Sequence, residues 1–340
     1  MRILLLRFSA LGDVILTLPL IKKLQKTYPQ AEITLVSRPY LKSLANALNI
    51  DFFSADIDHK YKGFKGLLKL SRHLQKQYQP THVIDLHNVL RTKVIRRYFR
   101  LTHAKTSYLL KDRASQKSLV QYPSKDFRPL PHITERYRQT IENTGLKLQF
   151  NPKTDHLLMP EVDLPEPILS ELVPGKNHLG LAPFSQHQSK QYPLNKLVEA
   201  FNALPQDEHI IWLFGGKNEQ PQLKNLAEKL HAKTIIVAGT LKLPQEIKLM
   251  SMLHAVLAMD SSNMHMAAVS GTKAISIWGA THPFAGYAPL GINEQYILQV
   301  PATELQCRPC SIYGKKPCFR GDHACMERLS ADKVKEKLQA

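Results

Sequence analysis

The sequence predicts an α/β protein built from two doubly wound parallel sheets. Short apolar runs alternate with amphipathic segments along both halves of the chain, which is the pattern of βαβ units. Between the halves lie residues 146–176, which contain five prolines and mark a domain boundary. The length of 340 residues also suits two domains of ordinary size.

The first half is expected to form a Rossmann-like domain over residues 1–160. Its opening apolar run is too short for a signal peptide or a membrane span, so a buried strand explains it better. Strands are expected at residues 2–7, 32–37 and 81–86, and helices at residues 11–28, 64–78, 89–100 and 132–143. Residues 111–130 are polar and basic with two prolines, and this composition favours a loop.

The second half is expected to form another Rossmann-like domain over residues 161–328, followed by a C-terminal helix over 329–340 that packs back on the first domain. Strands are expected at residues 178–182, 209–214, 234–237, 256–259 and 274–278, and helices at residues 194–204, 220–230, 244–253 and 263–270. Doubly wound sheets bind ligands at the carboxyl ends of their strands. Two such domains facing each other therefore predict an active site in a central cleft.

The charge of the chain is concentrated in its first half. The whole chain carries 46 Lys and Arg against 28 Asp and Glu, a net +18. Residues 1–160 hold 28 of these cations and 11 of the acids, a net +17, whereas residues 161–340 carry only +1. The first half is therefore expected to meet an acidic partner. Nucleic acid, an anionic membrane surface and a phosphorylated substrate all qualify.

A glycine and an aspartate follow the first strand. Gly12 lets a ligand approach the backbone, and the start of the following helix favours negative charge. Asp13 lies in the first turn of that helix, where it is either a capping residue or a general base at the mouth of the cleft. The dinucleotide fingerprint G-x-G-x-x-G does not occur in the sequence.

Three polar loops follow strands of the second half. Asp260 ends an apolar strand, and small polar residues then open a helix whose backbone N–H groups could cradle a phosphate. Lys190 could neutralise a diphosphate, and Glu219 could bond a ribose. Each loop alone is typical of a solvated turn or a capped helix, but three loops at one edge of one sheet support a binding site. The further candidates in these loops are Ser185, Gln186, Ser261, Ser262, Asn263 and His265.

All four cysteines lie near the C-terminus, in the pattern C-x2-C-x7-C-x6-C over Cys307, Cys310, Cys318 and Cys325. They are too few and too clustered for a disulfide scaffold. The ligand types suit zinc, but a second C-x-x-C is missing. Free thiols packed in a C-terminal loop are the alternative, and are slightly preferred.

Taken together, these motifs resemble glycosyltransferase family 9, the ADP-heptose:lipopolysaccharide heptosyltransferases, over nearly the whole chain. The matching segments are RILLLRFSALGDV (2–14), DLH (85–87), HITERY (132–137), FGG (214–216), MDSSNMH (259–265) and IWGATHP (277–283). The cysteine-rich tail is similar to tails in that family. One departure is the pair Ser261–Ser262, where many relatives have Thr-Gly, and it puts the identity of the donor sugar in doubt.

The resemblance implies a GT-B architecture, with the acceptor bound by the first domain and the donor by the second. The implied reaction is inverting transfer of a heptose from ADP-heptose to the inner core of lipopolysaccharide, onto Kdo or heptose. Asp13 would be the base, Lys190 would bind the diphosphate, Glu219 would face the nucleoside and Asp260 would contact the heptose. Ser185 or Gln186 would supply a polar contact, and Ser261, Ser262, Asn263 and His265 would line the phosphate. No D-x-D metal motif is present, so neither a metal nor another cofactor is expected, and fixed positive groups would stabilise the leaving diphosphate.

The basic first half would then meet a lipid A-core acceptor at the anionic surface of the inner membrane, with the enzyme cytoplasmic and peripheral on its inner face. The acceptor-binding candidates are Gly12, Arg91, Arg113 and Lys117, although a solvated basic face is the usual meaning of such charges. A transferase that uses another nucleotide sugar for a different surface glycan remains an alternative. A nucleotide-dependent epimerase or dehydrogenase and a basic nucleic-acid-binding protein are weaker ones, since the dinucleotide fingerprint and any nucleic-acid-binding module are missing. The sequence leaves the oligomeric state open.

Overall fold

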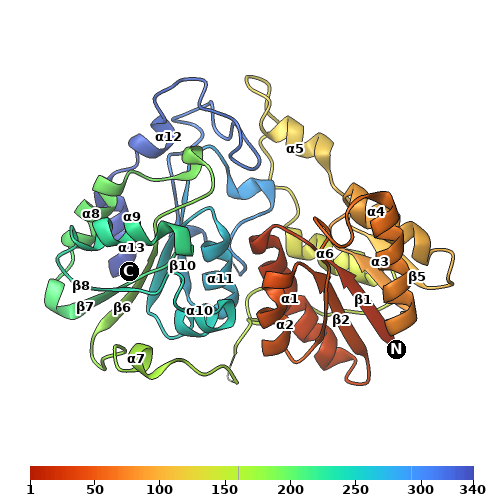
Figure 1. Cartoon of the computed structure of the whole chain (residues 1–340). Coiled ribbons are helices and arrows are strands. Elements are labelled where there is room, and N and C mark those ends of the chain that lie inside the picture. The colour runs from red at the N-terminus through yellow and green to blue at the C-terminus, as the bar shows by residue number, and fades with distance from the viewer. Residues whose placement is uncertain (160, 292) are drawn as a thin grey trace. The chain divides into compact units, whose positions relative to one another are not determined.

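The computed structural model describes residues 1–159, 161–291 and 293–340, and it divides the chain into two compact units (Figure 1). Unit 1 comprises Met1–Asp112 and His132–Glu161, and unit 2 comprises Arg113–Pro131 and Val162–Ala340. Each unit contains one parallel sheet with helices on both faces, which confirms the predicted fold class. Residue 160, at the predicted domain boundary, lies outside the described residues.

Unit 1 has a five-stranded sheet in the order β3-β2-β1-β4-β5, and all of its pairings are parallel. Its strands are β1 (Arg2–Leu6), β2 (Glu32–Ser37), β3 (Asp51–Ser54), β4 (His82–Asp85) and β5 (Lys105–Tyr108). Its helices are α1 (Leu11–Thr27), α2 (Lys42–Ala47), α3 (Gly63–Tyr78), α4 (Leu90–Phe99) and α6 (Ile133–Glu142), with a 3₁₀ turn at Pro39–Leu41. The two edge strands, β3 and β5, were not expected from the sequence.

After Arg2, the central strand β1 is apolar because both faces of the sheet are covered. Leu4 and Leu6 face one side, where they pack against Leu70 of α3 and Ile95 of α4. On the other side α1 and α6 pack together. The strand therefore holds its carboxyl end, and the residues that follow it, in a fixed position between two helix layers.

Unit 2 has a six-stranded parallel sheet in the order β11-β10-β9-β6-β7-β8. Its strands are β6 (Asn177–Ala182), β7 (His209–Leu213), β8 (Lys233–Ile236), β9 (Ala255–Met259), β10 (Lys273–Trp278) and β11 (Ile297–Gln299). Its helices are α5 (Arg113–Leu119), α7 (Glu166–Leu169), α8 (Leu194–Asn202), α9 (Gln220–Ala227), α10 (Leu243–Met250), α11 (Ser262–Ser270), α12 (Ala324–Glu327) and α13 (Ala331–Gln339). Short 3₁₀ turns lie at Gln188–Lys190, Gln206–Glu208, Lys217–Glu219, Pro283–Ala285 and Glu294–Tyr296.

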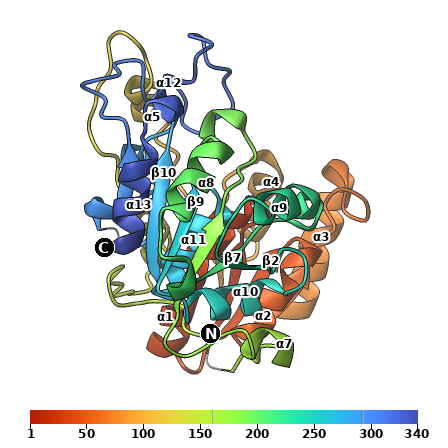
Figure 2. The same ribbon diagram turned by 90° about the vertical axis from the view of Figure 1, so that its left-hand side faces the viewer.

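The C-terminal helix α13 belongs to unit 2, where it packs beside α8 (Figure 2). Val334 and Leu338 join the same core as Phe201 of α8 and Leu226 of α9. The expectation that this helix packs back on the first domain was therefore wrong. Its apolar side chains complete the layer of α8 and α9 over one face of the unit 2 sheet.

The segment over residues 113–131 is not the plain loop that its composition predicted. It contains helix α5 (yellow in Figure 1), and it belongs to unit 2 although unit 1 precedes and follows it in the chain. The ring of Phe127 lies 4.9 Å from those of both His282 and Phe284, and the Leu130 N–H donates to the Phe284 carbonyl at 2.8 Å. Sequence composition missed this because the partners lie about 150 residues away along the chain.

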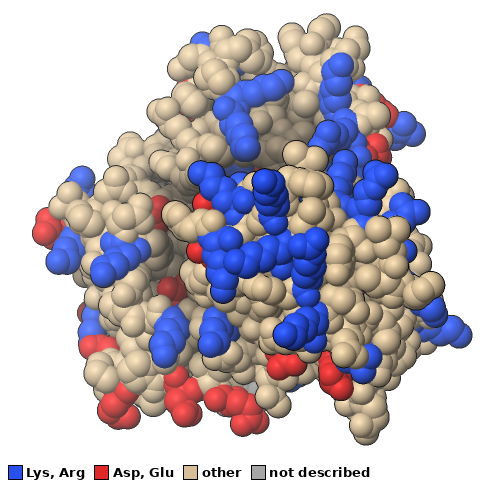
Figure 3. Space-filling view, turned by 45° about the vertical axis from the view of Figure 1, so that its right-hand side comes forward, with Lys and Arg blue, Asp and Glu red and all other residues tan. Residues whose placement is uncertain are grey.

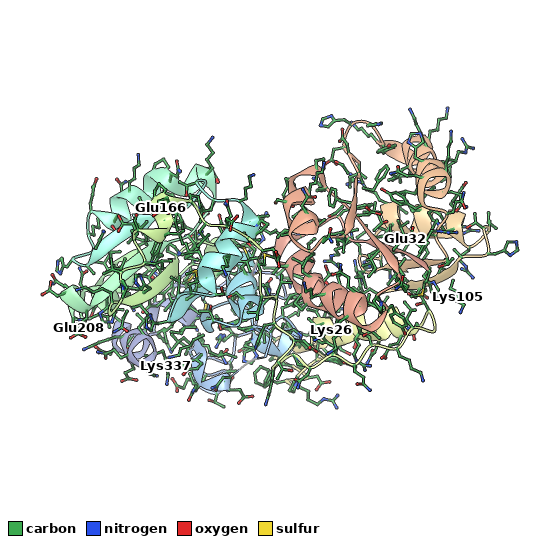
Figure 4. The ribbon with its side chains drawn as sticks, turned by 90° about the horizontal axis from the view of Figure 1, so that it is seen from below. Lys26, Glu32, Lys105, Glu166, Glu208 and Lys337 are labelled. Atoms are coloured by element: carbon green, nitrogen blue, oxygen red, sulfur yellow. The ribbon has the colours of Figure 1, made fainter. Side chains whose placement is uncertain are left out.

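The two ends of each parallel sheet differ in character. Figure 4 labels Glu32 and Lys105, the first residues of β2 and β5, and Glu208, which immediately precedes β7. These amino ends carry charged, exposed side chains. The residues singled out by the sequence follow the opposite, carboxyl ends, where a doubly wound sheet binds its ligands.

Candidate active site

Each sheet contains one point where the chain reverses the direction in which it adds strands. In unit 1 this switch point lies between β1 and β4, and in unit 2 it lies between β6 and β9. Connections on the two sides of such a point leave toward opposite faces, which opens room for a ligand beyond the strand ends. The predicted site residues of each unit are therefore described around its own switch point.

At the switch point of unit 2, an ion pair joins the residues that follow β6 and β9. Lys190 Nζ lies 2.8 Å from Asp260 Oδ2 and donates to the Asp260 carbonyl oxygen at 3.1 Å. The side chains are only 14% and 9% exposed, so this pair is largely removed from water. The structure thus brings Lys190 and Asp260 together, and the cation that could neutralise a diphosphate is already paired with a carboxylate.

Two hydroxyl groups complete this network. Ser185 Oγ donates to the Asp260 carbonyl at 3.2 Å, and Thr281 Oγ1 donates to Asp260 Oδ2 at 2.8 Å. Thr281 was not predicted as a site residue, although it lies in the segment IWGATHP that carries the family resemblance. A hydroxyl next to a strand end in that segment was the available signal.

The turn that holds Thr281 is fixed by a buried cation that the sequence reasoning also missed. Arg308 is only 1% exposed and donates to the carbonyls of Gly279 at 2.8 Å and Thr281 at 3.1 Å. Burial lowers its pKa to about 10, still far above neutrality, so the guanidinium remains charged. Nothing in its sequence neighbourhood distinguishes it from a surface arginine.

Helix α11 begins directly after Asp260. Ser261 occupies its N-cap position, yet its side chain makes no capping hydrogen bond, and its buried Oγ has no hydrogen-bond partner among the described residues. An N-cap serine ordinarily accepts from an N–H of the first turn. Here that hydroxyl and the positive end of the helix are left for another acceptor. Ser262 and Asn263 are half-exposed in this turn, whereas His265 is buried.

The other predicted donor residues lie at the same edge but outside this network. Glu219 turns back on its own loop, where Oε2 accepts the Gly216 N–H at 2.6 Å. Gln186 is exposed in the loop after β6. Within the described part of the chain, no hydrogen bond joins either of them to Asp260.

The cysteine-containing loop packs against Lys190. Ser189 Oγ donates to the Gly314 carbonyl at 2.7 Å, and a β-carbon added to Gly314 would lie 2.8 Å from Cγ and Cε of Lys190. Gly314 has a φ of +76°, a conformation that favours glycine. The loop therefore holds the lysine stem from one side and leaves no room there for a larger residue.

The four cysteines are free thiols. Burial is the main cause that raises the pKa of Cys325, to about 11, and of Cys310, so both remain protonated at neutral pH. In the described residues, no group of three or more His, Cys, Asp or Glu side chains is arranged to hold a metal ion.

At the switch point of unit 1, Asp13 is held by three groups. Arg7 Nη2 forms an ion pair with Oδ2, the Tyr137 hydroxyl donates to Oδ1 at 3.1 Å, and the Ala10 N–H approaches Oδ2 at 3.4 Å. The cap contact is the long one of the three. Arg7 is buried and also donates to the Leu86 carbonyl at 2.5 Å, which ties β1 to β4. Of the Asp13 side chain, 24% is exposed to solvent.

Beside it, a second carboxylate is fully enclosed. Asp85 at the end of β4 accepts the N–H groups of His87 at 3.0 Å and Asn88 at 2.7 Å, and pairs with Arg96 at 2.8 Å. Burial raises its pKa, and these contacts partly offset the effect. Arg96 in turn stacks 4.0 Å over the ring of Tyr108. These contacts hold the turn after β4, and the Asp85 carboxylate is not exposed to solvent.

The predicted acceptor-binding residues are divided between the units. Gly12 lies in the first turn of α1, and Arg91 lies in the first turn of α4, where it pairs with Asp58 at 3.4 Å. Arg113 and Lys117 are exposed on α5, which belongs to unit 2. The structure therefore does not group these four residues within unit 1.

Comparisons with known proteins agree with the motifs. The family model of glycosyltransferase family 9 (heptosyltransferase) matches residues 67–316. Lipopolysaccharide core heptosyltransferase OpsX of Haemophilus influenzae is 24% identical over 285 residues, which cover 82% of this chain and 79% of that protein.

Solved structures show the same fold. A family 9 glycosyl transferase from Veillonella parvula superposes with a TM-score of 0.73 at 18% identity, covering 99% of this chain and 96% of that one. Escherichia coli heptosyltransferase WaaC with ADP-2-deoxy-2-fluoro heptose gives 0.69 at 17% identity, covering 100% and 99%. Because the family model spans well over half of the residues and the motifs at both switch points agree with it, the chain belongs to glycosyltransferase family 9, the heptosyltransferase family.

Proposed function

We propose that this glycosyltransferase moves a heptose from ADP-heptose to the inner core of lipopolysaccharide, with inversion at the anomeric carbon. The observation that carries the proposal is the network of Lys190, Asp260 and Thr281 beside the uncapped start of α11. The OpsX relative is named for the same type of transfer, and the WaaC structure holds an ADP-heptose analogue.

Unit 2 is proposed to bind the donor. The first turn of α11 and the unpartnered Ser261 hydroxyl suit the diphosphate, because N–H groups and a positive helix end bind anions. Lys190 would swing its charge from Asp260 toward the departing phosphate, and Asp260, thereby released, would accept hydroxyls of the heptose. Glu219 and Gln186 would contact the nucleoside end of the donor from the neighbouring loops.

Unit 1 is proposed to bind the acceptor, with Asp13 as the general base. The acceptor hydroxyl would pass its proton to the Asp13 carboxylate while its oxygen bonds to the anomeric carbon. The bond from that carbon to the diphosphate oxygen would break, and ADP would leave with the electron pair. Arg7 and Tyr137 would keep the carboxylate oriented toward the attacking oxygen.

The direct test is incubation of the protein with ADP-heptose and a set of truncated lipopolysaccharides, analysed by mass spectrometry. Addition of one heptose to a Kdo-terminated or a heptose-terminated acceptor would support the proposal and identify the acceptor. A matched reaction with another nucleotide sugar tests the donor, since the Ser261–Ser262 pair departs from many relatives. Transfer from that other donor alone would overturn the assignment of ADP-heptose.

We also propose that unit 1 attaches the enzyme to the inner face of the inner membrane. Unit 1 carries 24 Lys and Arg against 11 Asp and Glu. On the face drawn in Figure 3, Lys and Arg form broad continuous areas, whereas Asp and Glu lie mainly along the lower edge. Phe64 and Leu90, in the first turns of α3 and α4, are 64% and 79% exposed and could enter the headgroup layer.

No helix among the described residues is long and apolar enough to span a membrane. Attachment would therefore depend on charge, and salt should weaken it. Sedimentation with phosphatidylglycerol vesicles at rising salt, with phosphatidylcholine vesicles as the control, measures this. Equal binding to both vesicles, or no effect of salt, would contradict the proposal.

A further inference from the structure

The carboxyl edge of the unit 1 sheet carries a group of cations that the chemistry of Asp13 does not use. Arg38 follows β2, Arg91 lies in the first turn of the helix after β4, and Lys111 follows β5. All three follow strands whose carboxyl ends share the edge at which His87 follows β4, and their charges, with that of Arg7, lower the pKa of its imidazole. Cations that follow four strands of one sheet thus act on a single ring.

The His87 side chain is a neutral imidazole at neutral pH. Burial, followed by the four cations, lowers its pKa to about 3. Its Nδ1 atom is buried without a hydrogen-bond partner among the described residues, and its ring meets Phe8 edge-on with the centroids 6.0 Å apart. A neutral imidazole can carry its proton on either nitrogen, so Nδ1 can serve as a donor.

Arg38 also carries a buried polar atom without a hydrogen-bond partner. Its Nε–H is buried and has no acceptor in the part of the chain that the structure describes. A buried donor without an acceptor is costly, and two such atoms at one edge of one sheet call for a shared partner. Since one is a guanidinium N–H and the other lies among cations, that partner is an anion.

A carboxylate of the protein already binds two of these cations. Asp58 binds Arg38 through Oδ2 at 2.9 Å and Arg91 through Oδ1 at 3.4 Å. It belongs to the segment after β3, and 43% of its side chain is exposed, so little holds it there against a competing anion. Asp58 bridges the two guanidiniums as the oxyanion of a ligand would.

We propose that Arg38, Arg91 and His87 form an oxyanion-binding site that takes a carboxylate or a phosphate of the acceptor, and that Asp58 occupies this site until the anion displaces it. The two guanidiniums bind the anion by charge-assisted hydrogen bonds, and His87 adds a neutral N–H. That the anion belongs to the acceptor rests on the proposed function, whereas the anion site itself does not.

The experiment measures anion binding to the full-length protein by calorimetry and by the His87 ring signal in NMR, assigned with His87→Gln. The probes are inorganic phosphate, the sugar acid Kdo and the neutral sugar mannose. We expect phosphate or Kdo, but not mannose, to bind and to shift the His87 signal. Whichever anion binds identifies the source of the oxyanion.

Substitutions of Asp58 and of the two arginines should change the affinity for the anion in opposite directions. Asp58→Asn removes the competing carboxylate and should tighten anion binding at least threefold, whereas Arg38→Gln and Arg91→Gln should each weaken it about tenfold. Arg72→Gln, at an exposed cation of α3, removes the same charge from unit 1 and should change binding less than twofold. Melting temperatures establish that each variant is folded.

The inference is overturned if Asp58→Asn fails to tighten binding, if Arg72→Gln weakens it as much as Arg38→Gln, or if neither anion shifts the His87 signal. These outcomes are independent of heptose transfer. An enzyme that transfers heptose but binds no anion at His87 refutes this site alone. Anion binding without transfer refutes the proposed function and leaves the site standing.

Discussion

The sheets of the two units share one topology, but the ion pair of Lys190 in unit 2 and the ion pairs of Asp58 in unit 1 balance their charges differently. In unit 2, Lys190 and Asp260 are both largely buried, and the carboxylate also accepts a hydroxyl from Thr281. In unit 1, Asp58 divides its two oxygens between Arg38 and Arg91, and these partners are 32% to 47% exposed. One site has a cation and an anion in balance, and the other has more cations than anions.

This difference separates two tasks that a binding site can perform. A buried, balanced pair has little field at a distance, so it acts by geometry once a ligand is in place. A half-exposed group with surplus cations attracts an anion from solution and exchanges an internal carboxylate for it at little cost. Recognition of a charged acceptor and activation of a donor are therefore expected to respond to different substitutions.

The largest effect is expected at Asp13. Asp13→Asn keeps the size of the side chain but removes proton acceptance, so the rate of transfer should fall by about 10²–10⁴. Asparagine also serves well as a helix cap, so the melting temperature should stay close to that of the parent. Turnover and melting are measured on one preparation. Tyr137→Phe, which keeps the carboxylate, is the control and should cost about tenfold. Turnover of Asp13→Asn within a few-fold of the parent would leave the capping role as the explanation.

The free energy of unfolding tests the contrast between the buried Lys190–Asp260 pair and the half-exposed Arg91–Asp58 pair. Lys190→Met leaves Asp260 buried without a cation and should lower the free energy of unfolding by about 3–5 kcal/mol. Arg91→Gln breaks a half-exposed pair and should cost about 0–1 kcal/mol. Urea unfolding measures both. The double variant Lys190→Met/Asp260→Asn should recover part of the loss, and equal losses in the two single variants would refute the contrast.

The two buried imidazoles give the units a pH dependence. Burial and the charges of Arg308 and Lys125 lower the pKa of His282 in unit 2 to about 3, below the ordinary value near 6.5. The unfolded chain therefore takes up this proton more readily, and stability is lost as the pH falls from 6.5 toward 3. At pH 5 the loss from His282 amounts to about 2 kcal/mol.

His282→Gln should remove that loss, because an amide oxygen can still accept the Phe284 N–H that Nδ1 now accepts at 3.1 Å. The measurement is the free energy of unfolding at pH 7 and pH 5. His87→Gln should act in the same direction with a change of similar size, because the pKa of the His87 imidazole is also lowered to about 3. An unchanged pH dependence in His282→Gln would show that other groups cause the acid sensitivity.

The smallest effect is expected where the C-terminal loop holds Lys190. Gly314→Ala adds a methyl group against the lysine stem and should raise the KM for the donor about threefold, leaving anion binding at His87 unchanged. Gly321→Ala is the matched control, because Gly321 has a φ of +77° but open space around its Cβ position. Both variants share a backbone cost of about 1–2 kcal/mol. An equal rise in KM for both would locate the effect in the backbone rather than at Lys190.

The sequence predicted the central strands of each sheet and the edge strand β8, but it missed the edge strands β3, β5 and β11. Strand β9, and strand β1 after Arg2, are apolar because both faces are buried, and such runs can be recognised without a structure. The edge strands β3 and β5 carry polar residues and half-exposed side chains, so their composition does not differ from that of loops. Helix α5 was missed for a different reason. Its segment packs within unit 2, and the rest of unit 2 lies much later in the chain.

For the candidate site, the sequence indicated which residues follow the strands but not what holds them. Asp13 and Asp260 stand out because each opens a helix after an apolar run. Their partners Tyr137 and Thr281 lie 124 and 21 residues away in the chain, and spacing alone does not pair them. The predicted grouping of Arg91 with Arg113 failed in the same way, because proximity in sequence did not place them in one unit.

The excursion of residues 113–131 into unit 2 has a consequence for how the protein is made. This segment leaves the ribosome before any strand of unit 2 exists, so Phe127 and Leu130 have no surface to cover until Phe284 has been synthesised. Until then this segment of the nascent chain has none of its unit 2 partners to pack against. Neither half is consequently a self-contained product of translation, and a gene cut near residue 161 would divide the second unit as well as separate it from the first.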